Sequence, residues 1–229
     1  MSGSLVVDGA VSELARRVSA TAAKDLDLIL EDLSLWVDCD SPSADPAALG
    51  EIVELIGRRL NHYGATVDVR SVEAGPSLRA VIEGQGRSRI ALLCHHDTVF
   101  PRGTAAARPF ARSGDAARGP GVADMKGGIA VAAHVLRLLS NAHAHTFGRL
   151  ELISVPDEEI RSVPFHGLEE LAGCDAVLCM ECGRPGGGIV TARKGGDWLE
   201  VEVKGSPAHA GVAAGDGRSA LLAACREAL

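Results

Sequence analysis

The stretch LLCHHDTVF, residues 92 to 100, joins an apolar run to three residues that can bind metal ions or protons. Residues 90 to 93 are aliphatic and favour a buried strand. His95, His96 and Asp97 follow at the carboxyl end of that strand, where ligands of open α/β sheets usually bind. The stretch therefore predicts an α/β fold with a binding site at this strand end. A strand that simply ends in solvent would show the same pattern.

Composition excludes several classes of function. The formal charge of −7 and the scattered Lys and Arg residues argue against a nucleic-acid partner, which would need a basic face. No apolar run is long enough to span a membrane, so we expect no membrane partner. The six cysteines come without a secretory signal and predict reduced thiols. We therefore expect a cytoplasmic protein.

Strand-like and helix-like segments alternate along most of the chain. This alternation predicts a mostly parallel sheet flanked by helices. Helical spacing covers residues 11–37, a capped helix begins at Asp45–Pro46, and another helix covers 125–139. Strands are predicted at 66–72, 78–83, 89–94, 149–155 and 176–180, with another possible at 189–192. Residues 101–123 form a long Gly- and Pro-rich loop of the kind that is usually functional or disordered.

A change of pattern near residue 197 predicts a second domain. WLEVEVKG alternates apolar and polar residues, as in a strand with one solvated face, and an amphipathic helix starts at Arg218. We expect one domain over residues 1–195 and the start of an α+β domain over 196–229. The second would be incomplete, because a strand and a helix rarely make a stable domain.

Acidic residues and one histidine follow the predicted strands. Carboxyl ends of parallel strands share one edge of a sheet, so these side chains should converge in one crevice. Carboxylates packed together raise each other's pKa unless cations neutralise them. One imidazole with several carboxylates suits zinc, and a bridging carboxylate suits a two-metal site. The residues concerned are His95, Asp97, Asp124, Glu158, Glu159 and Glu181.

Other interpretations remain open for some of these motifs. PDEE, residues 156–159, is also typical of a solvated turn. CMEC, residues 179–182, matches a redox or structural-zinc motif, but no second Cys pair accompanies it. GPGVADMKGG, residues 119–128, could hold a phosphate, although Lys-Ser/Thr does not follow the glycines. We expect His96 to face the other side of its strand, and His134 to be a surface or packing residue.

Six motifs in order resemble the dinuclear zinc amidohydrolase and peptidase family. They are HHDTVFPRGT, RPF, GPGVADMKGG, PDEE, ECGRP and GSPAHAG. The family includes glutamate carboxypeptidase, aminoacylase, acetylornithine deacetylase and succinyl-diaminopimelate desuccinylase, and the chain is most similar to the glutamate carboxypeptidase-like branch. The resemblance runs from about Leu33 to the last residue. It implies hydrolysis of peptide or amide bonds in a small peptide or N-acyl amino acid.

The resemblance also implies a metal centre. His95 and Glu181 would bind one zinc ion, Glu159 would bind the second, and Asp124 would bridge the two. Asp97 would accept a hydrogen bond from the other ring nitrogen of His95 and fix its tautomer. Cobalt or manganese could replace zinc, because geometry and availability decide metal identity.

Two further roles follow from the resemblance. Glu158 would be the general base that takes a proton from the attacking water and delivers one to the leaving amine. His209 would reach the active site of a neighbouring subunit and stabilise the oxyanion, which implies a homodimer. Cys182 stands where many relatives have Pro, but Glu181 before it is retained.

The resemblance finally implies that residues 1–195 are a catalytic metal-binding domain and that 196–229 begin a lid or dimerisation domain. It also implies that both are incomplete through a C-terminal truncation. Family members continue through the rest of the lid and return to the catalytic domain, where a late histidine completes the second zinc site. The sequence ends at LLAACREAL without such a segment. The alternative function is therefore an inactive fragment or a metal-binding, non-catalytic derivative of such an enzyme.

Overall fold

The chain forms two compact units in a computed structural model, Met1–Gly183 and Arg184–Leu229. The structure describes residues 9–142, 146–165, 167–196 and 200–227. The sequence places the domain boundary after residue 195, twelve residues beyond the observed division. The assignment of the two parts to a catalytic and a lid domain stays a prediction.

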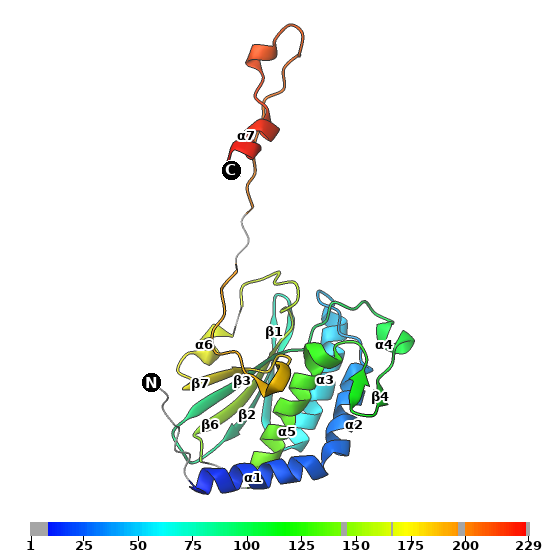
Figure 1. Cartoon of the computed structure of the whole chain (residues 1–229), viewed down its shortest axis with the longest axis vertical. Coiled ribbons are helices and arrows are strands. Elements are labelled where there is room, and N and C mark those ends of the chain that lie inside the picture. The colour runs from blue at the N-terminus through cyan, green and yellow to red at the C-terminus, as the bar shows by residue number, and fades with distance from the viewer. Residues whose placement is uncertain (1–8, 143–145, 166, 197–199, 228–229) are drawn as a thin grey trace. The chain divides into compact units, whose positions relative to one another are not determined.

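The first unit contains a five-stranded sheet of order β1-β2-β6-β3-β7 (Figure 1). β3 pairs in parallel with β6 and β7, whereas β2 is antiparallel to both β1 and β6. The α/β class with a helix-flanked sheet is confirmed, but the sheet is mixed because β2 runs against the other strands. The strands are β1 (Thr66–Val72), β2 (Gly75–Glu83), β3 (Arg89–His95), β6 (Arg149–Val155) and β7 (Ala176–Cys179).

Helices cover one face of this sheet (Figure 1). α3 (Pro46–His62) and α5 (Gly127–Asn141) contact the strands, and α2 (Leu26–Val37) packs against both helices. The predicted helical region 11–37 is divided at Asp25 into α1 (Gly9–Lys24) and α2. The core between helices and sheet is almost entirely aliphatic and includes Ile52, Ile56, Leu78, Leu92, Ile129, Leu136 and Leu152.

The loop over residues 101–123 is more structured than the sequence predicts. It contains α4 (Thr104–Ala107) and a hairpin of β4 (Ala111–Ser113) and β5 (Ala116–Arg118). The two strands are short and rich in alanine, a residue depleted from strands, so their pattern is weak. A π-type turn, η1 (Val122–Lys126), then leads into α5 and includes a cis peptide bond between Asp124 and Met125. α6 (Leu168–Leu171) precedes β7.

The second unit has little regular structure. It contains η2 (Pro185–Gly187), η3 (Ala214–Asp216), α7 (Ala220–Glu227) and a bridge between Ser206 and Arg218. The predicted strands are not formed at 189–192 or 200–204, and residues 197–199 lie outside the described part. No described side chain of 184–227 is buried, so a lid domain is not shown. Within the described residues, no helix has the length and apolarity needed to cross a bilayer.

Candidate metal centre at the carboxyl edge of the sheet

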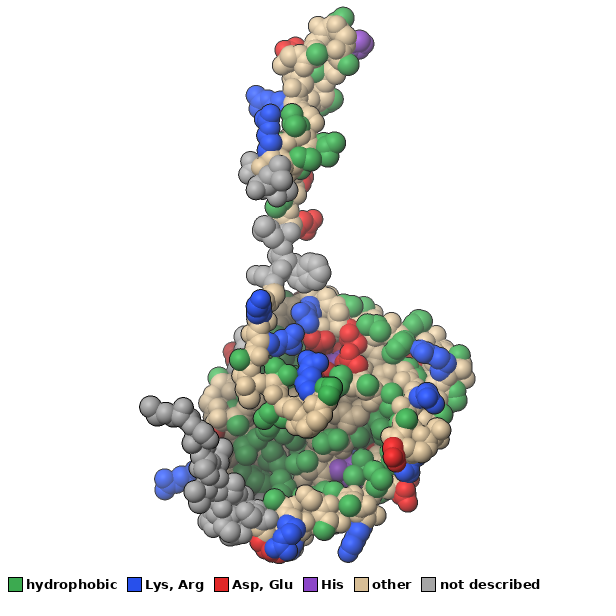
Figure 2. Space-filling model, in the orientation of Figure 1, with side chains coloured by type: hydrophobic (Ala, Val, Ile, Leu, Met, Phe, Trp, Pro, Cys, Tyr) green, Lys and Arg blue, Asp and Glu red, His purple; other side chains and the backbone are tan. Residues whose placement is uncertain are grey.

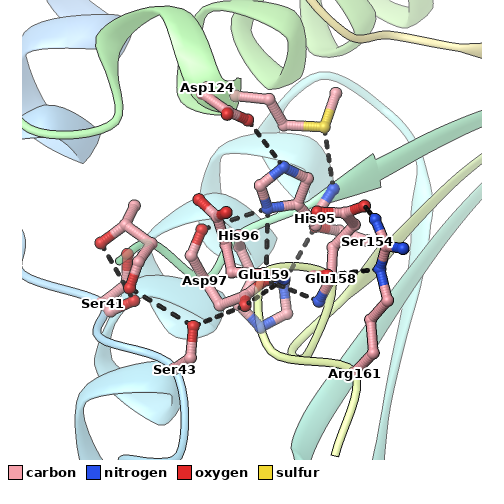
Figure 3. A network of polar contacts seen from close by, with 12 residues as sticks. Ser41, Ser43, His95, His96, Asp97, Asp124, Ser154, Glu158, Glu159 and Arg161 are labelled. Atoms are coloured by element: carbon pink, nitrogen blue, oxygen red, sulfur yellow. Dashed lines mark hydrogen bonds and ion pairs between the residues drawn. The ribbon is translucent and has the colours of Figure 1, made fainter. Parts of the chain in front are cut away.

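His95 is the last residue of β3, and its imidazole is buried. Its Nδ1 lies 3.2 Å from Oδ1 of Asp97 and 3.1 Å from the Asp97 carbonyl oxygen. Both oxygens only accept, so Nδ1 carries a proton that it donates to Asp97. Nε2 on the other side lies 3.0 Å from Asp124 Oδ1 (Figure 3). The same nitrogen lies 3.5 Å from Glu181 Oε1.

Acidic side chains from three other segments meet this imidazole. Two groups of residues could each hold a metal ion, and within each group the possible ligand atoms all lie within 4.8 Å of one another. One group is His95, Asp124 and Glu159, and the other is His95, Glu158 and Glu181. Nitrogen and carboxylate oxygen donors at this spacing are those that zinc and similar divalent ions prefer. The residues therefore fit the metal that the sequence implies. Neither group contains a cysteine, so the described residues give CMEC no metal site.

The electrostatics of the centre also suit a cation. Burial lowers the pKa of His95, but the hydrogen bond and charge of Asp97 and the nearby Glu181 and Glu158 charges outweigh it and raise the pKa to about 9. Burial, followed by the Asp124 charge, raises the pKa of Glu159. Burial and neighbouring carboxylates also raise the pKa of Glu181 despite the opposing effect of His95. Carboxylates that repel one another therefore surround the imidazole.

Asp97 holds more than the histidine. Its Oδ1 accepts a hydrogen bond from the backbone N–H of Glu158 at 3.1 Å, and its Oδ2 accepts one from Glu159 at 3.1 Å. Ser43 Oγ donates to the same Oδ2 at 2.7 Å. Although burial opposes ionisation, the hydrogen bonds from His95, Ser43 and the Glu159 N–H lower the pKa of Asp97. A buried carboxylate thus fixes both the ring and the turn that carries the two glutamates, a role that sequence reasoning missed.

The carboxylates of the centre are partly open to solvent. The Asp124 side chain is 58% exposed, and those of Glu158 and Glu181 are each 39% exposed. Figure 2 shows acidic side chains gathered on this face of the first unit, with basic side chains beside them. A substrate could therefore reach the carboxylates, whereas the imidazole and Asp97 are buried.

Close backbone packing brings Asp124 and Glu181 to the same place. A Cβ atom added at Gly128, in the first turn of α5, would lie 1.9 Å from the carbonyl oxygen of Met180. Glycine therefore lets the start of α5, which follows Asp124, touch the segment after β7 that carries Glu181. The backbone N–H of Met180 also donates to the Leu93 carbonyl at 2.9 Å, which extends the β7 pairing towards the centre.

Three sequence expectations fall outside this cluster. His96 faces away, as predicted, with its Nδ1 2.9 Å from Ser154 Oγ. Lys126 donates from Nζ to the Cys39 carbonyl at 2.7 Å, so the glycine-rich segment does not present this lysine to a phosphate. His209 lies in the second unit, where its Nδ1 accepts from the Gly211 N–H at 3.1 Å. Its role stays a prediction.

Comparisons with known proteins identify relatives of this chain. The chain is 32% identical over 203 residues to carboxypeptidase G2 from Pseudomonas sp. (strain RS-16), covering 86% of this chain and 49% of that enzyme. The chain thus spans about half the length of this relative.

Solved structures show the same fold at low identity. One is an M20 family metallo-carboxypeptidase from Sulfolobus solfataricus, with a TM-score of 0.60, 18% identity, and coverage of 69% of this chain and 38% of the other. Human carnosine dipeptidase 1 gives a TM-score of 0.58 and 17% identity over 72% of this chain and 40% of its own. A family model described as peptidase family M20/M25/M40 matches residues 91–229. On these matches, the chain belongs to the M20/M25/M40 peptidase family.

Proposed function

We propose that this chain carries the centre of a zinc-dependent hydrolase of small peptides or N-acyl amino acids. The supporting observation is the convergence of one buried imidazole with four carboxylates at the sheet edge. In this proposal His95 and Glu181 would hold one ion, Glu159 would hold the other, and Asp124 would serve both. Cobalt or manganese could occupy the same donors.

Bound divalent ions would polarise the scissile carbonyl and lower the pKa of an attacking water. The protein groups then have separate tasks. Asp97 keeps the proton of His95 on Nδ1, so that the lone pair of Nε2 is free to bind a metal ion. Glu158, partly exposed beside the donors, takes a proton from the water and passes it to the amine that leaves. General acid–base catalysis of this kind contributes about 10²–10⁴-fold to a rate.

The assembly and location belong to the same proposal. His209 would serve as an oxyanion donor to the centre of a second copy, so the working enzyme would be a homodimer. Its location would be cytoplasmic. The similarity to carboxypeptidase G2 supports a substrate with a free carboxylate next to the scissile bond.

A comparison of two adjacent glutamates tests the proposal. Glu158→Gln should retain metal, measured by calorimetric titration with zinc, and lower kcat on a panel of N-acyl and glutamyl substrates by about 10²–10⁴-fold. Glu159→Gln should instead weaken zinc binding. Glu83→Gln, at the opposite edge of the sheet, is the matched control and should change neither quantity.

The outcomes separate the rival functions. A wild-type chain that binds zinc but hydrolyses none of the panel would favour the non-catalytic, metal-binding derivative. Equal loss of zinc in the Glu158→Gln and Glu159→Gln proteins would remove the proton-transfer role from Glu158. No zinc binding at all would end the proposal.

A further inference from the structure

Glu158 and Glu159 are adjacent, yet the proposed function gives them different tasks. An oxygen of Glu158 lies within 4.8 Å of the possible ligand atoms of His95 and Glu181. An oxygen of Glu159 lies equally close to those of His95 and Asp124. Distance alone would therefore allow both glutamates to bind metal. Something else must keep one carboxylate free to carry a proton.

Arg161 contacts Glu158 at two points. Its Nη2 donates to Glu158 Oε1 at 2.9 Å, and its Nε donates to the Glu158 carbonyl at 3.2 Å (Figure 3). The guanidinium thus holds the side chain and the backbone of one residue together. Among the described residues, no other Lys or Arg forms an ion pair with a carboxylate of the two candidate metal-binding groups.

The backbone at Arg161 is shaped for this contact. Its φ angle is 50°, in the left-handed region that side chains other than glycine enter at a cost. Its N–H donates to the Asp157 carbonyl at 3.1 Å, which closes a tight turn around the two glutamates. This turn returns the arginine side chain to the residue three positions earlier.

The pair is too exposed to matter much for folding. The side chains of Arg161 and Glu158 are 69% and 39% exposed, and such pairs contribute little to stability. A weak contact can still choose between two nearby positions of one carboxylate. A cation at this point also repels an approaching metal ion, which favours a free Glu158.

We propose that Arg161 is a positioning residue that holds the Glu158 carboxylate out of the metal-ligand set. This inference rests on the proposed function and deepens it, because it explains how adjacent glutamates take different tasks. Without the guanidinium, Glu158 would join the His95 and Glu181 donors as an additional ligand.

Cobalt(II) titration of the full chain tests the inference through a double-mutant cycle. The proteins are wild type, Arg161→Gly, Glu158→Gln and the double variant. Glycine suits the left-handed backbone, so the Arg161→Gly protein should fold. We expect Glu158→Gln to weaken cobalt binding at least about fivefold more in the Arg161→Gly background than in wild type. The cycle cancels the change in charge that both backgrounds share.

The visible spectrum of bound cobalt reports its coordination. The spectrum of the Arg161→Gly protein should differ from wild type and return towards it when Glu158→Gln is added, because an extra ligand changes the geometry. Arg161→Lys should keep the wild-type spectrum. Arg87→Gly removes an arginine just before β3, at the far end of the strand from His95, and should leave both affinity and spectrum unchanged.

Two failures are distinguishable. If cobalt binds but Glu158→Gln has the same effect in both backgrounds and the spectra coincide, the role of Arg161 is overturned while the proposed function stands. If the wild-type chain binds no cobalt or zinc, the proposed function is overturned and the inference with it.

Discussion

Asp97 is the residue on which the geometry of the candidate metal centre depends most. Its two carboxylate oxygens accept from His95, Ser43 and the backbone N–H groups of Glu158 and Glu159. A neutral amide accepts through one atom only. Asparagine at this position would therefore place an NH₂ group against at least one of these donors and shift either the ring or the turn.

Asp97→Asn should lower zinc affinity by about 10–100-fold, as is usual when the partner of a ligating histidine is removed. Calorimetric titration measures the change. Ser43→Ala is the matched control, because it removes one donor to Asp97 but leaves the carboxylate, and its effect should be smaller. An Asp97→Asn protein with zinc affinity within about twofold of wild type would show that the carboxylate does not organise the centre.

The site residues divide into those that sequence patterns reveal and those that they do not. His95 and Glu181 follow apolar runs, so strand ends point to them directly. Ser43 is 54 residues from Asp97 in the sequence and reaches it only because Pro42 bridges to Thr98. No local pattern encodes that contact. Arg161 sits in an exposed turn, where a charged residue is the ordinary expectation.

At the scale of elements, the packing of α5 against the segment after β7 sets the spacing of the centre. Gly128→Ala would place a Cβ atom 1.9 Å from the Met180 carbonyl oxygen and 2.9 Å from Met125 Cε. The backbone contact has to give, so α5 or the chain before Glu181 must move. We expect about 1–3 kcal/mol of destabilisation, as for other overpacked sites, with weaker zinc binding.

Gly50→Ala in α3 provides the comparison for that prediction. Nothing lies within 4 Å of a Cβ atom there, and Gly50 is inside a helix. This change should stabilise the protein by about 0.5–1 kcal/mol and leave zinc binding unchanged. Urea unfolding and zinc titration of both variants measure the difference. Similar results for the two glycines would refute the role of close packing at Gly128.

A buried polar cluster joins the helices on the covered face of the sheet. Asp32 of α2 accepts hydrogen bonds from Tyr63 and, at 2.9 Å, from His134 Nε2 of α5. Arg137 Nε donates to His134 Nδ1 at 3.0 Å, and Arg59 Nε of α3 lies 2.5 Å from Asp32 Oδ1. The prediction that His134 is a surface or packing residue holds for its burial but misses these partners.

Asp32 should make stability sensitive to acid. Burial raises its pKa, but hydrogen bonds from His134 and Tyr63 and the Arg59 charge lower it below the usual 3.8. A depressed pKa stabilises the folded state above the unfolded pKa, and the contribution disappears as pH falls through the folded pKa. We expect Asp32→Asn to cost about 3 kcal/mol at pH 7, as for a broken buried pair.

The difference in unfolding free energy between wild type and the Asp32→Asn protein should shrink below about pH 4. Urea unfolding between pH 7 and pH 3 measures it, and other acidic groups cancel in the comparison. A difference that stays constant with pH would show that ionised Asp32 is not what stabilises the cluster. Asp27→Asn, an exposed change in the same helix, is the control.

Elements with strong local patterns were predictable, and those that depend on tertiary contacts were not. Residues 66–72 and 149–155 form β1 and β6 as predicted, because apolar β-type residues are bounded by turns. β2 is antiparallel to β1 because a two-residue turn at 73–74 folds the chain back, a signal that the sequence analysis did not use. Its pairing with β6, about 70 residues later, leaves no mark on the strand itself. The break at Asp25 lacks a Gly or Pro that would announce it.

At the scale of the whole molecule, the aliphatic core and the candidate metal centre belong to the first unit. Six of the seven site residues predicted from the sequence lie there, and His209 lies in the second unit. The chain also spans about half of its carboxypeptidase relative. Which metal ions this chain can bind is therefore best judged from the possible metal ligands that its own first unit brings together.

Those metal ligands would be divided unequally between two ions. His95 supplies the imidazole of both described metal groups, so a second ion would be left with carboxylates such as Asp124 and Glu159. Imidazole binds zinc well, whereas carboxylates alone suit harder ions.

We expect one tightly bound zinc per chain and a second bound at least about tenfold more weakly, with His95→Gln losing the tight one. His62→Gln, an exposed change in α3, is the control. Elemental analysis after dialysis and calorimetric titration measure both sites. Two zinc ions of equal affinity would mean that further ligands complete the second site.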